Sequence, residues 1–355
     1  MSVLKVLRVQ GCWCYGCQGA KGAQVLKVLL RVLGVVGAIA VTACVSGPVR
    51  IGMPGSPSVP QRPATIRVQV RDGTALVVRD VPLEEYVAAA ALSEVHPDVT
   101  DAAVAERIFE VQAVLARTYA LANRGRHARD GFDLCSTTHC QLYEPARLRT
   151  SRWASSAREA GRLTAGELIW FDGAPARAVF HADCGGHTSD ASAVWGGVAL
   201  PYLTAERDGG PADRAHAGWT FETPASSLRA ALNADPRTAV GARLDRIEVA
   251  GRDASGRAEQ IVLRGTRTFV VRGEVFRDAV TRALGVTSLR STLFTVKKTR
   301  AASAKATAPE EGFVFSGKGF GHGVGLCQSG AIARIRAGAR VDDVLAHYFP
   351  GTTLR

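Results

Sequence analysis

The sequence has 355 residues, enough for one large domain or two smaller ones, and its 46% hydrophobic and 21% charged residues are ordinary for a globular protein. The formal net charge of +12 suits an acidic partner, such as a cell-envelope polymer or an anionic membrane surface. Because the chain carries no motif for reading bases, nucleic acid is excluded as an expected partner.

The N-terminus has the pattern of an export signal. Basic residues precede the apolar run from Val32 to Val41, which is too short to span a bilayer as a stable helix. Cys44 follows small residues and resembles the lipobox cysteine of bacterial lipoproteins, which becomes lipidated. We therefore expect residues 1–44 to be a lipoprotein signal, with a plain cleavable signal or an uncleaved anchor as alternatives. The protein is expected in the periplasm or cell envelope, anchored to the membrane, with Pro-, Gly- and Ser-rich residues 45–64 as a flexible tether.

Residues 65–355 are expected to form a single domain that opens with a β-hairpin. Apolar residues alternate from Ile66 to Val70, Asp72-Gly73 is a turn signal, and the apolar pattern resumes at Ala75. Later segments predict hairpins at Glu167–His181 and Arg246–Leu263, a strand at Thr268–Val271, a helix at Gly273–Leu284 and a solvated loop at Lys297–Glu311. Strands and helices do not alternate regularly, so we predict an α+β fold with antiparallel sheets.

Two helices are predicted directly after the first hairpin. Apolar residues recur at helical spacing from Leu83 to Ala90, and His96-Pro97 ends this helix because a residue before proline avoids the α region. The second helix is expected to start after Thr100 as its N-cap. Its apolar stripe consists of Ile108, Val111, Leu115 and Tyr119. Glu94 would then lie at the end of the first helix, facing the gap between the two.

The predicted position of Glu94 favours a carboxyl group that keeps its proton. The last turn of a helix carries partial negative charge, and both this charge and partial burial raise the pKa of a carboxylic acid. A protonated carboxyl near neutral pH is what general-acid cleavage of a glycosidic bond requires. On position alone, Glu94 could also be a solvated surface residue, which is the commoner case for glutamate.

Four potential zinc ligands fall within 14 residues: His127, Cys135, His139 and Cys140. Thiolate and imidazole groups suit tetrahedral zinc, although the spacing is looser than that of a CxxC motif. The alternatives are a disulfide bond between Cys135 and Cys140 in an oxidising compartment, or free thiols.

Two glycine-rich segments carry the other cysteines of residues 65–355. Cys184, with His181 and His187 nearby, has the residue types of a cysteine nucleophile, but Gly185-Gly186 fits a tight turn better. We predict a disulfide bond between Cys184 and Cys327 that closes a loop of about 140 residues; the alternative is two buried residues that act as small hydrophobes.

The alternate glycines from Gly317 to Gly325 lack the ending of a phosphate-binding loop, so a bound nucleotide is not expected. Such glycines allow the backbone to approach a sugar chain or another strand closely. His322 and Gln328 would then be polar groups on a groove, although a buried His322 satisfied within the core is an equal alternative.

Several ordered motifs resemble the SpoIID/LytB (sporulation stage II protein D) family. The resemblance covers roughly Thr65 to Leu354 and rests on Leu83, Tyr86, Val87 and Glu94, VQAVLARTYAL ending at Leu121, FHADCGGHTSDASAVWGG from Phe180, PYL from Pro201, GKGFGHGVGLCQSGA from Gly317 and HYFPGTTL from His347. It implies a SpoIID-like fold and a lytic transglycosylase that cleaves peptidoglycan glycan strands between N-acetylmuramic acid and N-acetylglucosamine. Glu94 falls at the family's catalytic acid.

In the chemistry that the resemblance implies, the sugar's own 6-hydroxyl attacks the anomeric carbon, so a second catalytic carboxylate is not required. Similar cysteine-rich segments bind zinc in some family members, which implies a structural zinc in this chain. The residues expected to face the substrate are Arg117, Tyr119, His181, His322 and Gln328. The alternative function is a noncatalytic peptidoglycan-binding enhancer of a cell-wall amidase, and His96 before Pro97, where a shorter spacing is common in the family, keeps it open.

Overall fold

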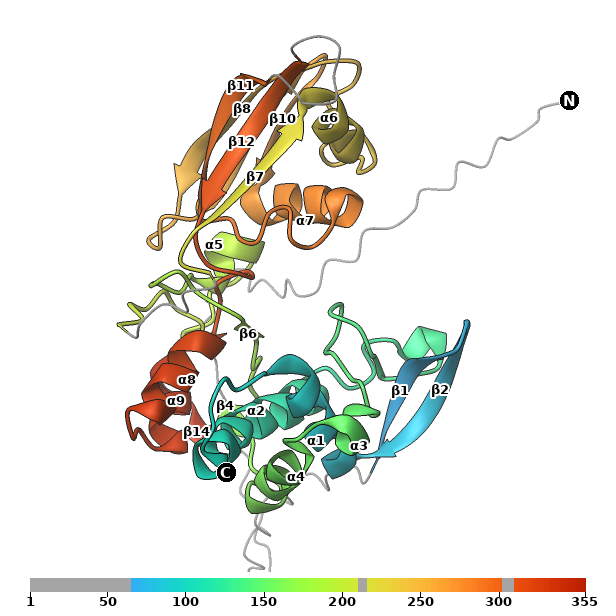
Figure 1. Cartoon of the computed structure of the whole chain (residues 1–355), viewed down its shortest axis with the longest axis vertical. Helices are drawn as coiled ribbons and strands as arrows, with labels where there is room; N and C mark the ends of the chain where they lie inside the picture. The colour runs from blue at the N-terminus through green and yellow to red at the C-terminus, as the bar shows by residue number, and fades with distance from the viewer. Residues whose placement is uncertain (1–64, 210–215, 302–309) are drawn as a thin grey trace, which may run out of the picture. The chain divides into compact units, whose positions relative to one another are not determined.

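The computed structural model describes residues 65–209, 216–301 and 310–355, which are coloured along the chain in Figure 1. The expected signal at residues 1–44, with Cys44, and the expected tether at residues 45–64 lie outside these ranges. In the part of the chain that the structure describes, no helix is both long and apolar enough to cross a membrane.

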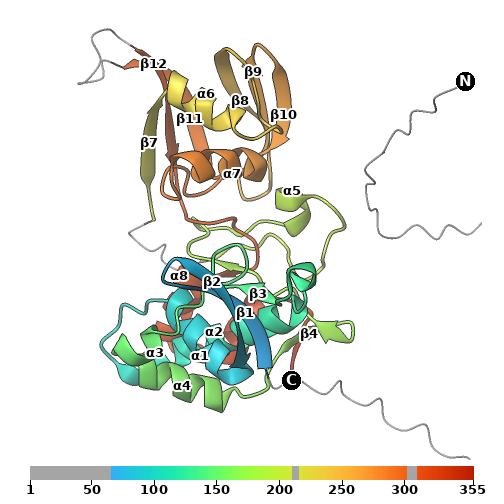
Figure 2. The same ribbon diagram turned by 90° about the vertical axis from the view of Figure 1, so that its right-hand side faces the viewer.

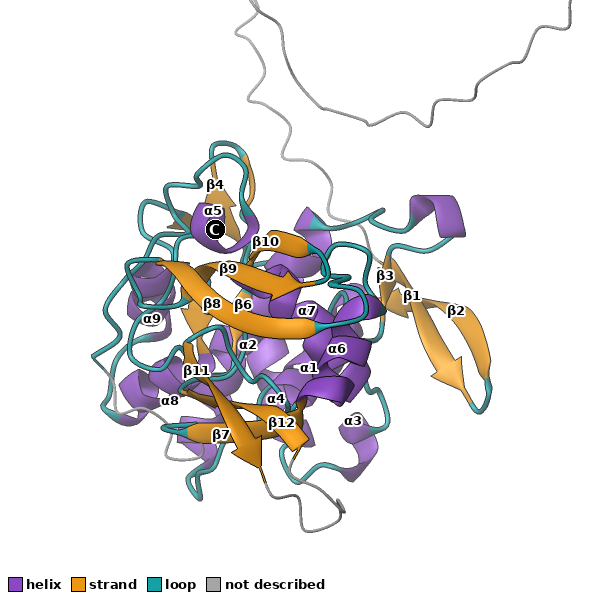
Figure 3. Cartoon of the chain, turned by 90° about the horizontal axis from the view of Figure 1, so that it is seen from above, coloured by secondary structure: helices purple, strands orange, loops and turns teal. Residues whose placement is uncertain are grey.

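The predicted first hairpin is present and is extended by a third strand. Strands β1 (Thr65–Asp72) and β2 (Ala75–Pro82) pair antiparallel, and the short β3 (Leu134–Cys135) pairs parallel to β1. The alternating residues Ile66, Val68 and Val70 are buried, as the period-2 pattern predicts. The turn end of the hairpin extends away from the helices in Figure 3.

The predicted helical pair is also present. Helices α1 (Leu83–Glu94) and α2 (Ala102–Ala122) contact each other, and both contact α4 (Ala154–Leu163). The sequence misplaced the start of α2, because the N-cap is Asp101 and not Thr100. The Asp101 side chain accepts hydrogen bonds from the N–H groups of Ala103 and Val104, which lack partners within the helix.

Short elements from the middle and the end of the chain complete the surroundings of this pair. They are η1 (Ala128–Asp130), α3 (Arg147–Thr150), β4 (Ile169–Phe171), β5 (Ala174–Pro175), β6 (Phe180–His181), α5 (Ala191–Trp195), β13 (Leu326–Cys327), α8 (Gln328–Arg336), α9 (Val341–Tyr348) and β14 (Thr353–Leu354). The predicted hairpin at Glu167–His181 is only partly correct. Strand β4 pairs with β5 and β14, but β6 leaves them and pairs parallel with β13, which joins two distant glycine-rich segments.

Residues 219–317 contain two further antiparallel sheets. Their elements are β7 (Trp219–Pro224), α6 (Ala225–Asn233), β8 (Leu244–Arg252), β9 (Ala258–Gly265), β10 (Thr268–Arg272), α7 (Gly273–Leu284), β11 (Phe294–Ala301) and β12 (Glu310–Gly317). The sheet orders are β10-β9-β8 and β11-β12-β7. Figure 2 shows α6 and α7 against these strands, and both helices contact strands of this region. The loop predicted at Lys297–Glu311 is wrong at both ends, because β11 continues to Ala301 and β12 begins at Glu310.

The buried apolar residues form two clusters. The first joins α1, α2 and the first hairpin to α8 and α9, and the second is confined to residues 219–315. The fold is therefore mixed α+β with several small antiparallel sheets, as predicted, and with two short parallel pairings that the sequence did not indicate.

Candidate active site

Glu94 is the last residue of α1 and lies where the helix meets the loop that follows Cys140. Its Oε1 accepts a hydrogen bond from the Leu142 N–H at 2.6 Å. Burial raises the pKa of this carboxyl to about 7; the Leu142 bond opposes the rise, and the nearby Glu144 adds to it. A sizeable fraction of Glu94 therefore holds its proton at neutral pH.

The Glu94 carboxyl opens onto a cavity of about 550 Å³. The lining residues come from α2, the His127–Cys140 region, and the segments around β6, α5 and the glycine-rich run: Glu94, Tyr119, Asn123, Arg126, Thr138, His139, Cys140, Arg177, Val179, Phe180, Trp195 and His322. Among the described residues lining this cavity, Glu94 is the only carboxylate. Of the predicted substrate-facing residues, Tyr119 and His322 do line it.

Cationic and aromatic groups surround the acid. Arg126 and Arg177 are exposed, and Arg126 Nη1 donates to the Tyr119 hydroxyl at 3.3 Å. Burial raises the pKa of Tyr119 to about 12, so the phenol stays neutral. The Trp195 ring is 43% exposed and lies 5.0 Å from the His322 ring. The cavity therefore offers hydrogen-bond donors and an open aromatic face beside an acid that is partly protonated at neutral pH.

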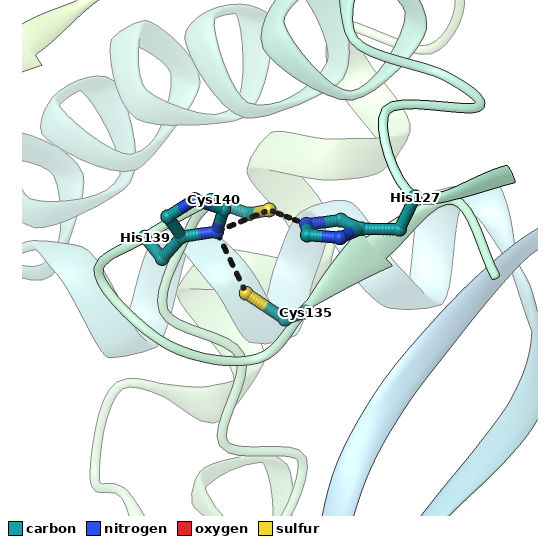
Figure 4. A group of neighbouring side chains, drawn as sticks. All are labelled: His127, Cys135, His139 and Cys140. Atoms are coloured by element: carbon teal, nitrogen blue, oxygen red, sulfur yellow. Dashed lines mark hydrogen bonds between the residues drawn. The ribbon is translucent and has the colours of Figure 1, made fainter. Parts of the chain in front are cut away.

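His127, Cys135, His139 and Cys140 converge on one point, as Figure 4 shows. His139 Nδ1 lies 3.7 Å from the sulfur atoms of both Cys135 and Cys140, and His127 Nε2 lies 3.2 Å from Cys140 Sγ. One ligand atom from each residue lies within 4.8 Å of the others. Two thiols and two imidazoles at this separation fit the donor set of a tetrahedral zinc.

The surroundings of the cluster also suit a metal. The Asp130 carboxylate lies 3.4 Å from His127 Nδ1, which leaves Nε2 directed at the sulfur. Burial raises the pKa of Cys140 to about 11. Burial also acts to raise the pKa of Cys135, but hydrogen bonds with Thr137 and Cys140 outweigh this effect, and the net shift is downward. Cys140 and His139 line the Glu94 cavity, so this cluster forms part of its wall.

The structure corrects the prediction that Arg117 contacts substrate. Its side chain is fully buried, and its guanidinium pairs with Glu84 through Nε–Oε1 (2.9 Å) and Nη2–Oε2 (2.5 Å). The same group donates to the carbonyl oxygens of Gly161 and Glu167. Arg117 thus joins α1, α2 and α4, and no part of its side chain is accessible to a ligand.

Gln328 and His181 are also not where the sequence placed them. Gln328 Nε2 donates to the Glu94 backbone carbonyl at 3.2 Å and lies 3.2 Å from Gln112 Oε1, so it holds the end of α1 and does not line the cavity. His181 is only 4% exposed and lies behind His322, at 5.5 Å between rings. Both residues are positioned to support groups that line the cavity.

Cys184 and Cys327 lie together, as the predicted disulfide requires, but both are free thiols in the structure. The Cys184 N–H donates to Cys327 Sγ at 3.2 Å. Gly185 and Gly186 both have positive φ, consistent with the tight turn expected there, and Cys184 is only 2% exposed. A buried thiol cannot attack an external substrate, so the cysteine-nucleophile interpretation fails.

Sequence reasoning missed Asn123, Arg126, Arg177 and Trp195. Trp195 lies within a segment that carried the family resemblance, and Arg126 directly precedes His127, so both had a local signal. Arg177 had none, because its place beside Glu94 depends on where β6 runs.

Two family models match parts of the chain. Residues 71–171, which include the helical pair and the four Cys/His residues, match the model for the stage II sporulation protein SpoIID. Residues 212–325, a range that contains the whole second apolar cluster, match a domain of unknown function, DUF8618.

Individual relatives point the same way. An amidase enhancer of Bacillus subtilis is 26% identical over 74% of this chain and 40% of its own length, and a stage II sporulation protein D of Bacillus subtilis is 25% identical over 78% and 75%. This chain belongs to the SpoIID/LytB family. An uncharacterised protein of Brachyspira hyodysenteriae is 30% identical over 79% of this chain and 68% of its own length. Membership in the SpoIID/LytB family supports a function related to the cell wall.

Proposed function

We propose that this SpoIID/LytB protein is a lytic transglycosylase that cleaves peptidoglycan glycan strands between N-acetylmuramic acid and N-acetylglucosamine. The supporting observation is Glu94, whose carboxyl pKa is raised to about 7 by burial and which opens onto a cavity of about 550 Å³. General acid catalysis needs a group that still holds its proton at the working pH. Membership in a cell-wall family supplies the substrate class.

In the proposed reaction, Glu94 first donates its proton to the glycosidic oxygen as the bond to the anomeric carbon breaks. The carboxylate then accepts the proton of the same sugar's 6-hydroxyl, whose oxygen bonds to the anomeric carbon and closes a 1,6-anhydro ring. The acid returns to its protonated form with no water consumed. A hydrolase of the two-carboxylate type would need a partner acid across the sugar, and the described lining of this cavity has none.

The other lining residues have assignable roles in this proposal. The exposed Trp195 ring can stack on the apolar face of a sugar, and Arg126 and Arg177 can donate hydrogen bonds to its hydroxyl, amide or carboxylate oxygens. Tyr119 packs beneath Arg126 and keeps a neutral hydroxyl near the acid.

A zinc at His127, Cys135, His139 and Cys140 would have four protein ligands and hence no open position for water. Its proposed role is structural. The backbone of the loop that follows Cys140 donates to Glu94 through Leu142, so a fixed cysteine cluster would also fix the acid.

The test is incubation of the full chain with peptide-free glycan strands, followed by mass spectrometry for 1,6-anhydro products. Glu94→Gln should lower the rate by at least about 10²–10⁴-fold, because it removes the transferable proton from a side chain of nearly the same shape. Glu85→Gln is the matched control, since Glu85 lies exposed on the same helix, and it should cleave like the wild type. Wild-type turnover in Glu94→Gln would refute the assignment.

A second candidate function is favoured by the similarity to an amidase enhancer. In this case the cavity would bind glycan without cleaving it, and the partner would be a cell-wall amidase. The two functions separate in one assay: an enhancer raises amidase turnover on whole peptidoglycan and leaves purified glycan strands intact. Under either function we propose an extracytoplasmic location, with a lipid anchor at Cys44 still a prediction.

A further inference from the structure

A second group of metal-binding residue types lies outside the cavity lining. His181 in β6, Cys184 three residues later and Cys327 in β13 each offer a ligand atom, and these atoms lie within 4.8 Å of one another. The parallel pairing of β6 and β13 sets His181 opposite Cys327, although 143 residues separate Cys184 from Cys327. All three side chains are at most 4% exposed.

The His181 ring has the hydrogen-bond pattern of a metal ligand. Nδ1 lies 3.1 Å from the Val324 carbonyl oxygen, which can only accept, so Nδ1 carries the proton and Nε2 has a free lone pair. Nε2 is buried and has no hydrogen-bond partner among the described residues. Leaving the buried Nε2 without a partner costs free energy. A metal bound at Nε2 would remove this cost, and metal-bound histidines commonly donate their other N–H to a carbonyl, as Nδ1 does here.

The two sulfur atoms are surrounded by backbone donors. Gly186 N–H donates to Cys184 Sγ at 3.2 Å, and Cys327 Sγ accepts from Cys184 N–H at 3.2 Å and from Gly330 N–H at 3.4 Å. Cys327 is also the N-cap of α8, where the helix dipole favours negative charge. These donors favour thiolates, but the Cys327 thiol, burial and the Asp208 carboxylate outweigh them and raise the pKa of Cys184, so a bound metal would have to displace its proton.

A carboxylate lies beside the group. Asp208 is 5% exposed, and its Oδ2 lies 3.4 Å from Cys184 Sγ. The same carboxylate is fixed by the Tyr348 hydroxyl at 2.8 Å and by Arg334 at 3.0 Å. Asp208 does not belong to the group of ligand atoms that lie within 4.8 Å of one another, so it lies beside the site and not in it.

We propose that His181, Cys184 and Cys327 bind one Zn²⁺, with the Asp208 carboxylate beside the site. Zinc binding replaces the protons of both thiols, so two protons are released for each ion bound. The donor set of one imidazole and two thiolates is compatible with zinc. This site is separate from the His127–Cys140 cluster and does not depend on the proposed glycan cleavage.

The position of the site indicates its role. The second apolar cluster is formed by residues 219–315, which lie between Cys184 and Cys327 in the sequence. An ion bound by both cysteines would tie together two points of the chain that lie on either side of this segment in the sequence. It would also fix Phe180 and His322, which line the Glu94 cavity next to His181.

The test is zinc per chain in the full-length protein purified without added metal. Wild type is expected to hold two ions, and Cys184→Ser and His181→Ala each one. Cys135→Ser, the matched control at the other cluster, should also retain one, and the Cys135→Ser/Cys184→Ser double variant none. The proposal would be overturned if the wild-type protein held one zinc ion and Cys135→Ser held none.

Because Cys184→Ser could fail to fold, a second measurement uses wild-type protein alone. After metal removal under reducing conditions, Co²⁺ titration should give thiolate-to-cobalt absorption that saturates at two ions per chain. Saturation at one ion counts against the site. Intact mass analysis of native protein decides the main rival: a loss of two hydrogens, mapped to Cys184 and Cys327, would show a disulfide and overturn the metal.

Discussion

At the scale of single residues, Glu94 combines two requirements that oppose each other. Burial makes its carboxyl a proton donor near neutral pH, but the same burial makes the ionised form costly to the fold. The Leu142 N–H offsets part of this cost by donating to the carboxyl. A glutamate placed in this way is expected to serve chemistry at some expense of stability.

This expense gives a prediction with a definite sign. The pKa of Glu94 is raised from 4.5 to about 7. Its contribution to the free energy of unfolding is therefore complete below pH 4.5 and is lost as the pH rises through 7. The loss amounts to about 3 kcal/mol at 1.36 kcal/mol per pKa unit. Glu94→Gln lacks a titrating group, so its stability relative to wild type should improve by this amount between pH 4.5 and 8. Denaturant unfolding at both values measures it; a pH-independent difference would contradict the raised pKa.

Arg117 within α2 and Arg126 in the turn after α2 provide a contrast between a buried and an exposed arginine. Arg117→Ala should destabilise the fold by about 3 kcal/mol, because buried carbonyl groups lose their donor and a cavity forms. Arg126→Ala should leave the melting temperature within about 2 °C of wild type, since surface changes are small, but weaken glycan binding. Thermal melts and binding to glycan strands test both. The roles would be reversed if Arg126→Ala lost stability and kept binding.

At the scale of elements, the loop from Cys135 to Leu142 connects the cysteine cluster to Glu94, the proposed catalytic acid. Its start pairs with β1, its middle carries His139 and Cys140, and its end donates to Glu94. The Glu144 N–H adds a further bond to Ser93 Oγ at 2.9 Å, next to Glu94 in α1. A change at the cluster is therefore expected to reach Glu94 through the backbone.

We predict that His127→Ala lowers glycan cleavage about tenfold or more while leaving Glu94 chemically intact, because the loop loses one fixed end. Removal of metal with a chelator should reproduce the effect in wild type, and added Zn²⁺ should restore it. The control is chelation of His127→Ala/Cys184→Ser, which lacks a ligand at both proposed zinc sites and should lose little further activity. Full activity in metal-free wild type would show that the loop holds its shape without an ion.

The sequence predicted these elements where the signal is local. Helical spacing located α1 and α2, and four ligands within 14 residues converged as expected because a short loop can bring them together. The prediction failed for Arg117, although α2 is largely apolar from Val111 to Ala120, which favours a buried arginine over an exposed one. The partners of β6 and the place of Arg177 could not be predicted, because both depend on pairing with residues about 145 positions away.

At the scale of the whole molecule, the strands β11 and β12 show how composition misled. The run from Lys297 to Glu311 is rich in Lys, Arg and Ala, which suggested a solvated loop. Charged residues are compatible with a sheet that is buried on one face only, and Phe294, Phe313 and Phe315 bury that face in the second cluster. Charge predicted which surface meets water, but not the backbone conformation.

The net charge leads to the last prediction. The chain carries a formal charge of +12, and Arg126 and Arg177 line the cavity whose acid is half protonated near pH 7. An anionic polymer should therefore bind partly through long-range attraction, which salt screens over about 8–10 Å at physiological ionic strength.

Binding of the full chain to purified peptidoglycan should fall several-fold between 50 and 500 mM NaCl (order-of-magnitude estimate), since most exposed charge pairs are screened in that range. Binding to chitin, an uncharged N-acetylglucosamine polymer, should change much less, because it depends on stacking and hydrogen bonds in the cavity. Using Glu94→Gln in both arms removes cleavage from the measurement. Equal salt sensitivity for both polymers would mean that the basic surface does not contribute to recognition, and that the cavity alone selects the glycan.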